Sequence, residues 1–382
     1  MRALGRLGAF VLAFAAACGG GDDGPPGVSG TVQYEDRPQT SAGSLGGIQL
    51  LPARGVQISL IAEADGAVLV TGVTGDDGTY RLDFPEAGPA ELSHLLVATI
   101  SESVERPIQV HNRARAVHGF GGASFAADET TQDVVVTAAS NAAEAFNVFD
   151  QLVLNADTVR ETLGVMPPPL TAIWQQGSQD GTYYSGSTLH LLGAPDDDDG
   201  YDDSVILHEA GHFVEDTVGR SDSPGGGHDG SPTNPTLAWS EGFSTYWAMA
   251  ALGAPFYGDS NSGGGWSYDG DTSATTAEQP SGGMDQDVSE DMITEILWDL
   301  GDAGAADDDS LPGDQTAVRV VQPLYLRTAV LRTVGRQGVD LVDFLDGFFV
   351  ANGLADCAGV RNVVTGTRRF PYDYAGPAGA CP

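Results

Sequence analysis

The chain has 382 residues, of which 41% are hydrophobic, so it contains enough apolar material for ordinary folded cores. It carries 53 acidic residues against 17 basic ones, all of them arginine, for a formal net charge of -36. This negative charge repels the phosphates of nucleic acids and anionic lipid headgroups, so we exclude both as binding partners. The length exceeds that of most single domains and predicts two folding units.

The first residues have the layout of an export signal. Arg2 and Arg6 precede an apolar run too short for a stable membrane span, so we assign 1–17 to a signal peptide and 18–27 to a flexible tether. The small residues before Cys18 resemble a bacterial lipoprotein signal, in which that cysteine is acylated. This predicts an exported protein at the outer membrane or cell surface, held there only by a lipid on Cys18. Simple cleavage and secretion is the alternative.

Two further cysteines, Cys357 and Cys381, lie near the C-terminus. In the oxidising environment outside the cytoplasm such a pair can form a disulfide that closes a loop. Two independent thiols are the alternative, because sequence spacing does not show whether the two side chains meet. The even number of cysteines that remains after Cys18 is set aside is consistent with export.

Residues 28–138 have the alternation typical of β-strands. Apolar and polar residues alternate at 55–61 and at 80–84, and Asp77-Gly78 predicts a turn between two strands. We therefore predict an antiparallel all-β sandwich of about seven strands. The stretches VSGTVQY, LPARGVQISLI and TGDDGTYRLDFP resemble the carboxypeptidase-regulatory, or transthyretin-like, domain. That resemblance implies an accessory role without catalytic residues.

A second domain is predicted to begin near residue 140, where the apolar residues change to helical spacing. Residues 170–174 and 182–193 read as strands, and an acidic loop follows them. Beyond the histidine-rich stretch at 205–213, helices are predicted at 237–252, 289–300, 316–334, where Pro323 would introduce a kink, and 339–351. Strands followed by helices predict an α+β domain over 140–382.

The stretch VILHEAGHF, residues 205–213, places two histidines four positions apart, with a glutamate directly after the first. On a helix, His208 and His212 lie one turn apart on the same face, so both imidazoles can bind one ion. Neutral imidazole suits Zn²⁺, and Glu209 would lie beside the metal, where a general base can take a proton from water. The alternative is an amphipathic helix in which hydrogen bonds satisfy both histidines.

A second segment, LAWSEGFSTYWAMAALG, contains a third candidate ligand, Glu241, separated from His212 by 28 residues. It resembles the third-ligand helix of the gluzincin metallopeptidases and is most similar to that of the aminopeptidase N family. The resemblance implies that the two histidines and Glu241 are zinc ligands, and that Glu209 is the catalytic base. Ser240 stands where that family has asparagine, and the exopeptidase signature Gly-Ala-Met-Glu-Asn is absent. We therefore expect an endopeptidase or another gluzincin-like peptidase.

Three further residues have candidate roles near this site. His228 follows three glycines, and a hydrogen bond from it could stabilise the oxyanion of a tetrahedral intermediate; a solvated loop histidine is the alternative. Tyr246, five residues after Glu241, is a candidate for the same role, with a packing aromatic as the alternative. Thr245, one turn beyond Glu241, is expected to orient a metal ligand.

Two acidic clusters offer oxygen ligands of the kind that Ca²⁺ takes. One comprises 196–199 with Asp202 and Asp203, just before the histidine-rich stretch, and the other lies at 307–309. Neither has the spacing of an ordered calcium loop. A solvated acidic loop is therefore the default interpretation, with a Ca²⁺ site as the alternative.

Together these features predict a multidomain exported zinc metallopeptidase, in which an all-β transthyretin-like sandwich precedes an α+β gluzincin-like domain. Its substrate would be a peptide or protein, with Zn²⁺ polarising the scissile carbonyl and Glu209 moving a proton from the attacking water to the leaving amine. Two alternatives remain: a surface binding or adhesion lipoprotein whose zinc site is structural or vestigial, and an amidase acting on wall material. The sequence indicates no oligomeric state.

Overall fold

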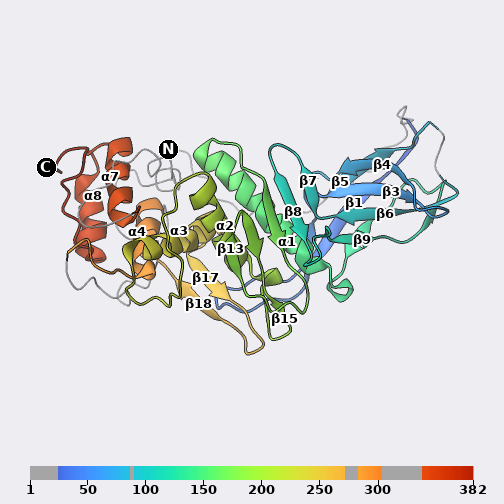
Figure 1. The fold of residues 1–382 in the computed structure, drawn as a ribbon. Coiled ribbons are helices and arrows are strands. Elements are labelled where there is room, and N and C mark those ends of the chain that lie inside the picture. Colours follow the sequence, from blue (N-terminus) through green and yellow to red (C-terminus); the bar gives the residue numbers. More distant parts are fainter. Residues whose placement is uncertain (1–24, 87–89, 272–282, 303–337, 382) are drawn as a thin grey trace, which may run out of the picture.

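The structure is a computed structural model that describes residues 25–86, 90–271, 283–302 and 338–381. The predicted signal peptide, Cys18, most of the tether, the acidic run at 307–309 and the predicted helix at 316–334 with Pro323 lie outside these residues. Figure 1 shows β-sheets at one end of the molecule, helices at the other, and a mixed layer between them. None of the described helices is long and apolar enough to cross a membrane.

The N-terminal part is a sandwich of two sheets. One sheet contains β1 (Gly27–Asp36), β2 (Gln49–Pro52), β5 (Thr79–Asp83) and β11 (Val134–Val136). The other contains β3 (Gln57–Ala62), β4 (Val68–Val73), β6 (Leu92–Ala98), β9 (Gly119–Gly121) and β10 (Phe125–Ala126). Alternate residues of both sheets, such as Val32, Ile58 and Val97, are fully buried and form the core between them.

The strand pairing differs from the prediction in two respects. The two sheets have nine strands in the described residues rather than about seven. They are also not wholly antiparallel, because the last strand, β11, returns beside β1 in the parallel direction, with Val134 opposite Val32. The predicted turn at Asp77-Gly78 is confirmed: Gly78 has a φ of 75°, and the turn leads from β4 in one sheet to β5 in the other.

A third sheet joins the two predicted domains. Its spatial order is β13-β14-β12-β8-β7, with β7 (Ile100–Glu102), β8 (Pro107–His111), β12 (Leu170–Ile173), β13 (Tyr183–Ser185) and β14 (Thr188–His190). Strands β8 and β12 are parallel, with Ile108 opposite Leu170. The predicted boundary between 138 and 140 therefore cuts through a sheet, because β8, from before it, pairs with β12, from after it.

The stretch at 182–193, predicted as a strand, is a hairpin of β13 and β14 followed by a loop. Gly186 and Ser187 both have positive φ values, 57° and 62°, as a two-residue turn between antiparallel strands requires. Two small hairpins follow in the chain: β15 (Gly193–Ala194) with β16 (Asp197–Asp198), and β17 (Phe256–Asp259) with β18 (Trp266–Asp269). The second of these lies against α2 and borders the site described below.

The helices form the remainder of the second half. They are α1 (Ala143–Thr158), α2 (Asp203–Thr217), α3 (Pro235–Leu252), α4 (Glu290–Gly301), α7 (Leu341–Asn352) and α8 (Cys357–Arg361), with short helical turns at η1 (Ala138–Ser140), η2 (Val159–Leu163), η3 (Asp199–Tyr201) and η4 (Asn362–Thr367). The helices predicted at 237–252, 289–300 and 339–351 are confirmed as α3, α4 and α7. Asn234 caps α3, Pro235 occupies its first turn, and Gly253 ends it with a φ of 64°.

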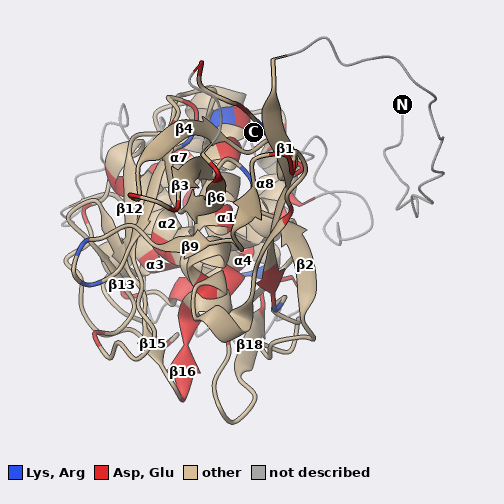
Figure 2. Cartoon of the chain, turned by 90° about the vertical axis from the view of Figure 1, so that its right-hand side faces the viewer, with Lys and Arg blue, Asp and Glu red and all other residues tan. Residues whose placement is uncertain are grey.

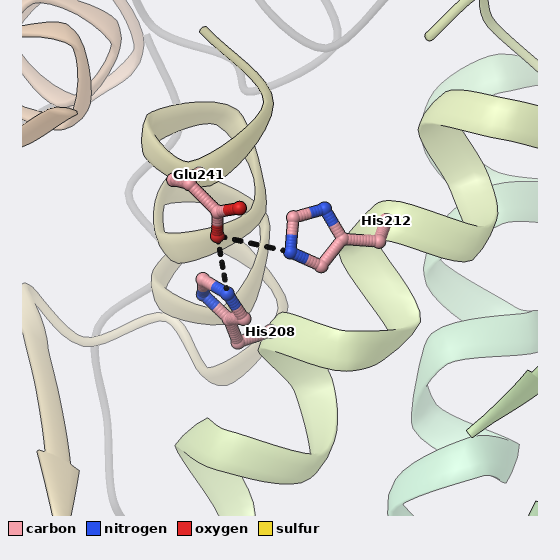
Figure 3. Close-up of side chains that lie close together, drawn as sticks. All are labelled: His208, His212 and Glu241. Atoms are coloured by element: carbon pink, nitrogen blue, oxygen red, sulfur yellow. Dashed lines mark hydrogen bonds and ion pairs between the residues drawn. The ribbon is translucent and has the colours of Figure 1, made fainter. Parts of the chain in front are cut away.

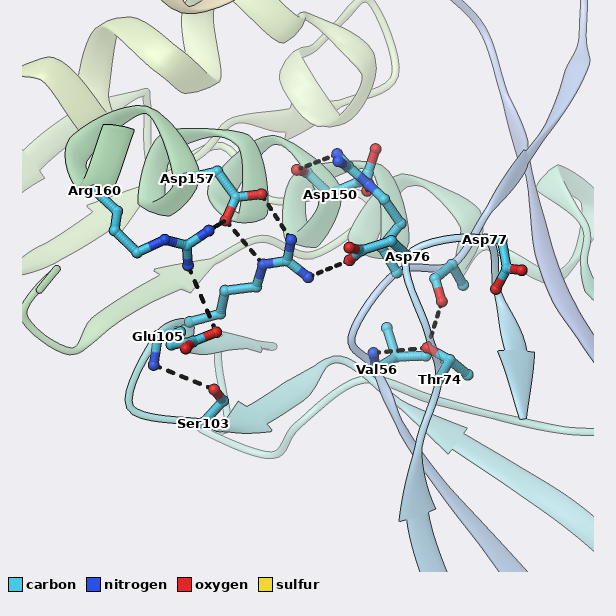
Figure 4. A network of polar contacts seen from close by, with 12 residues as sticks. Val56, Thr74, Asp76, Asp77, Ser103, Glu105, Asp150, Asp157 and Arg160 are labelled. Carbon is cyan, nitrogen blue, oxygen red and sulfur yellow. Dashed lines mark hydrogen bonds and ion pairs between the residues drawn. The ribbon is translucent and has the colours of Figure 1, made fainter. Parts of the chain in front are cut away.

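Arginine side chains tie the sandwich to α1 (Figure 4). Arg106, from the turn between β7 and β8, contacts Asp157 of α1 at 2.7 Å and Asp76 of the sandwich at 2.5 Å. Arg54 contacts Asp150 of α1 at 2.6 Å. In the pairs with Asp150 and Asp157 both side chains are largely buried, so these two pairs are screened less by solvent than surface pairs are. They hold the sandwich and the helical region together.

A disulfide closes the C-terminal segment. Cys357 and Cys381 are bonded, with their Cα atoms 5.8 Å apart, so the predicted pairing is confirmed. Closing a loop of this length contributes on the order of 3 kcal/mol by restricting the unfolded chain. Between them, Arg368 is buried and forms ion pairs with Glu295 and Asp299 of α4. The C-terminal segment is thereby fixed against α4, whose first residue borders the candidate site.

Candidate metal centre

The site is built on the packing of α2 against α3. The two histidines of the sequence motif lie on α2 and are one turn apart, and Glu241 lies on α3. Gly211 permits the close approach of the two helices, because a Cβ at this position would lie 2.7 Å from the Cα of Ser244. Gly242 performs the same function between α3 and α4, where an added Cβ would lie 2.6 Å from the carbonyl oxygen of Glu290.

His208, His212 and Glu241 converge on one point (Figure 3). The Oε2 atom of Glu241 lies 3.3 Å from His208 Nε2 and 3.1 Å from His212 Nε2. One ligand atom from each residue lies within 4.8 Å of the others, so the three can hold a metal ion. Two imidazole nitrogens and one carboxylate oxygen form a donor set that suits Zn²⁺ and leaves a coordination position open.

Hydroxyl groups fix the outer nitrogens of both histidines. His208 Nδ1 lies 3.0 Å from the hydroxyl of Thr245, the residue predicted to orient a ligand. His212 Nδ1 lies 3.1 Å from Ser240 Oγ and 2.9 Å from Ser244 Oγ. Such contacts orient the two rings so that both Nε2 atoms face Glu241. Ser240, which stands where the aminopeptidase N family has asparagine, therefore contacts the candidate ligand His212.

The three residues are electrostatically coupled. Burial alone would raise the pKa of Glu241, but the hydrogen bonds from His208 and His212 outweigh it and hold that pKa far below the usual range. Burial opposes the charged form of His212 as well, yet the hydrogen bond to Glu241 raises its pKa to about 9. A positive charge is thus favoured at this point of the fold, and a metal ion would replace the proton.

Two cavities meet at the cluster. One, of about 730 Å³, contains Glu209 and is bordered by Tyr184, Gly226 and Asp259. The other, of about 390 Å³, lies toward α4 and is bordered by Trp266 and Asp291. Both are lined by the same four residues at their junction: His208, His228, Glu241 and Tyr257. Glu209 is buried beside the two histidines, as the motif predicts.

His228 lies at the site and is held by α4. Its Nε2 atom is 3.4 Å from Glu241 Oε2, and its Nδ1 atom is 3.0 Å from Glu290 Oε2. Glu290 also accepts a hydrogen bond from the backbone N–H of Gly230. The hydrogen bond to Glu290 raises the pKa of His228 above its ordinary value. His228 is thus a partly exposed loop histidine that contacts Glu241 and Glu290, and its role in stabilising an oxyanion stays a prediction. No signal in the sequence pointed to Glu290 beyond its place in the first turn of a helix.

The prediction that Tyr246 takes part in catalysis is wrong. A residue five positions after Glu241 on a helix lies on nearly the opposite face. Tyr246 is accordingly buried in the hydrophobic core, with 1% of its surface exposed. Tyr257 of β17 lines both cavities instead, with its ring centroid 5.3 Å from that of His208. Nothing in the sequence around Tyr257 distinguishes it from an ordinary strand residue.

The acidic stretch before α2 is folded rather than a solvated loop. Asp199 and Asp202 are buried, and β16 forms an acidic strand (Figure 2). Asp197, Asp199 and Asp259 bring carboxylate oxygens within 4.8 Å of one another. Burial and the neighbouring carboxylates raise the pKa of Asp199 to about 8 and that of Asp259 to about 6. These groups could hold a cation, and the Ca²⁺ site stays a prediction.

Comparisons with known proteins place the site in a peptidase context. Residues 160–323 match the family model of the Mycolysin C-terminal domain, a stretch that includes both motif helices. That domain is found in zinc metallopeptidase-related proteins, so the match supports a peptidase-related protein. No curated protein matches the chain.

One solved structure that matches the chain is a 9R-lipoxygenase from Cyanothece PCC8801. The match covers 40% of this chain and 27% of the lipoxygenase chain. The identity is 10% and the TM-score is 0.17, so this likeness carries no argument about the fold. The chain thus spans about a quarter of the length of that protein. The peptidase context therefore rests on the family model and on the geometry of the site.

Proposed function

We propose that the chain is a zinc-dependent peptidase in which His208, His212 and Glu241 hold the metal and Glu209 is the general base. The convergence of these three side chains beside Glu209, at the junction of two cavities, is the observation that carries this proposal. When bound, zinc supplies a Lewis acid that polarises a carbonyl and makes water a better nucleophile near neutral pH. The family-model match supports the same kind of protein.

Residues of the chain would then transfer the proton and stabilise the negatively charged oxygen. Glu209, buried at the same cavity, takes the proton of the attacking water as the water oxygen bonds to the carbonyl carbon. It returns that proton to the nitrogen as the carbon–nitrogen bond breaks. His228, held at Nδ1 by Glu290, donates a hydrogen bond from Nε2 to the oxygen that becomes negatively charged.

The arrangement of the cavities favours an endopeptidase. One cavity extends from the cluster toward β13 and Asp259, and the other extends toward α4 and Trp266. A peptide bond at the junction can therefore have chain on both sides of it. An exopeptidase needs one side closed by groups that bind a chain terminus.

We also propose that the protein is exported and attached to the membrane only through a lipid on Cys18. The export-like layout of residues 1–17 supports this. The bond between Cys357 and Cys381 supports it as well, because disulfides persist in oxidising compartments. A peptide or protein outside the cytoplasm is then the substrate.

The proposal is tested by metal analysis of the purified protein together with cleavage of a peptide library. We expect stoichiometric zinc, cleavage at internal peptide bonds, loss of cleavage after treatment with a chelator, and recovery when zinc is added back. Zinc without cleavage of any peptide would favour the binding or adhesion lipoprotein. Cleavage that survives complete metal removal would contradict the mechanism.

The library should also reveal a preference for basic side chains near the cleaved bond. Carboxylates line both cavities, and no arginine in the described residues does; these carboxylates include Asp216, Asp259 and Asp291. Such walls attract arginine and lysine and repel acidic residues. We expect peptides with arginine to be cleaved faster than the same peptides with citrulline, and the difference to shrink at high salt. Equal rates for both would contradict this preference.

A further inference from the structure

Glu215 is a buried carboxylate that the proposed mechanism does not use. It lies on α2, three residues after His212, and is fully buried. Its Oε2 atom accepts a hydrogen bond of 2.6 Å from the hydroxyl of Ser240 on α3. Burial raises the pKa of Glu215 to about 7, while the Ser240 hydroxyl acts in the opposite direction. Burying a carboxylate is costly, so its place in this helix interface calls for an explanation.

The hydrogen bond to Glu215 determines how the Ser240 hydroxyl can contact His212. Ser240 Oγ lies between Glu215 and His212 Nδ1, at 2.6 Å from one and 3.1 Å from the other. A hydroxyl has one proton to donate, and an ionised carboxylate can only accept. The Ser240 proton therefore goes to Glu215, and the Ser240 oxygen is left to accept from the imidazole.

The contact with Ser240 therefore favours a hydrogen on Nδ1 of His212. Ser244, 2.9 Å from the same nitrogen, could donate to it or accept from it, so this residue alone leaves the tautomer open. With Ser240 as an acceptor, His212 carries a hydrogen at Nδ1. The hydrogen that Nε2 shares with Glu241 in the metal-free protein is then the one lost on metal binding, which frees the Nε2 lone pair. That lone pair is the one a metal would need.

The packing of the helices explains why the contact passes through a hydroxyl. At Gly211 the backbones of α2 and α3 approach so closely that even a Cβ would clash with Ser244. A serine on α3 bridges the gap between a carboxylate and an imidazole that both belong to α2. We call the hydrogen-bonded chain of Glu215, Ser240 and His212 the relay. It depends on Ser240, the position at which the sequence differs from the aminopeptidase N pattern.

We propose that Glu215, acting through Ser240, is a positioning residue that fixes the tautomer and orientation of His212 for metal binding. This inference rests on the proposed metal site. It names a pair of residues whose removal weakens the site without removing a ligand or the general base.

The test compares zinc affinity, measured by competition with a chelator, in the purified wild type and four variants. We expect Glu215→Leu and Ser240→Ala each to weaken zinc binding by roughly 10- to 100-fold, the usual effect of losing such a partner. The double variant should be no weaker than Ser240→Ala, because both changes break one chain of hydrogen bonds. Glu215→Gln should recover most of the affinity, because its amide oxygen can still accept from Ser240.

A matched control removes another buried carboxylate. Glu144→Leu on α1 makes the same change away from the histidines and should leave zinc affinity unaltered. If Glu215→Leu binds zinc as wild type does, or if its effect adds fully to that of Ser240→Ala, the relay is wrong. Thermal unfolding of each variant shows whether a loss of affinity is a loss of folding.

A second readout does not require zinc. In the metal-free Glu241→Ala variant at pH 10, which has no carboxylate facing Nε2, nitrogen NMR of labelled histidine reports which nitrogen of the neutral His212 ring carries the hydrogen. We expect Nδ1 in this variant and a mixture when Glu215→Leu is added. The same Nδ1 tautomer in both would overturn the relay. Failure of the wild type to bind zinc, with the tautomer difference intact, would instead count against the proposed function alone.

Discussion

The Glu209→Gln variant should bind zinc as the wild type does and lose peptidase activity by about 10²- to 10⁴-fold. The amide has nearly the shape of the carboxylate, so the packing beside the two histidines is preserved. It has no basic oxygen that can take a proton from the attacking water, so the chemical step fails while the metal ligands are untouched. The measurements are zinc content and kcat/KM for a peptide identified in the library.

The matched control makes the same chemical change at an exposed position. Glu161→Gln, on the short helical turn after α1, lies outside both cavities and should retain wild-type activity. Full activity in Glu209→Gln would remove the general base from the mechanism. Loss of zinc from Glu209→Gln would show that this residue supports the metal instead.

The sequence predicted the parts of the site that depend on local spacing. The two motif histidines and Glu209 follow from helix geometry, because positions four apart on one helix share a face whatever surrounds them. Glu241 was predicted only through a family resemblance, since no local rule brings α3 onto α2. Thr245 was predicted to orient a ligand because it lies one turn beyond Glu241, and its hydroxyl does lie within hydrogen-bond distance of His208 Nδ1.

The parts that the sequence did not predict depend on contacts between distant elements. Tyr257 reaches the site because β17 packs against α2, and Glu290 reaches it because Gly242 lets α4 approach α3. The sheet formed by β8 and β12 likewise joins residues about 60 positions apart, which alternation within one segment cannot show. Tyr246 lies away from the site because positions five apart on a helix point in nearly opposite directions, so α3 buries this side chain in the core.

His228→Ala should retain zinc and lower kcat/KM by about 10²- to 10³-fold, the usual effect of removing a group that stabilises an oxyanion. The reason is that His228 Nε2 lies 3.4 Å from Glu241 Oε2, beside the proposed metal ligands, while Glu290 contacts Nδ1. His94→Ala is the matched control, because His94 also contacts a glutamate, Glu63, but on the sandwich. Loss of zinc from His228→Ala would make this histidine a ligand.

The pH dependence separates His228 from a merely structural residue. Its hydrogen bond to Glu290 raises its pKa, so the protonated, donating form persists to higher pH than for an ordinary histidine, and activity should fall as pH rises through that pKa. Glu290→Gln removes the charge that favours the imidazolium, so the alkaline limb of kcat/KM should move to lower pH while zinc content stays constant. An alkaline limb that does not move in Glu290→Gln would mean that a group other than His228 controls it. If the neutral imidazole were the active form, His228 would control the acidic limb instead, and Glu290→Gln would move that limb to lower pH because it lowers the pKa of His228.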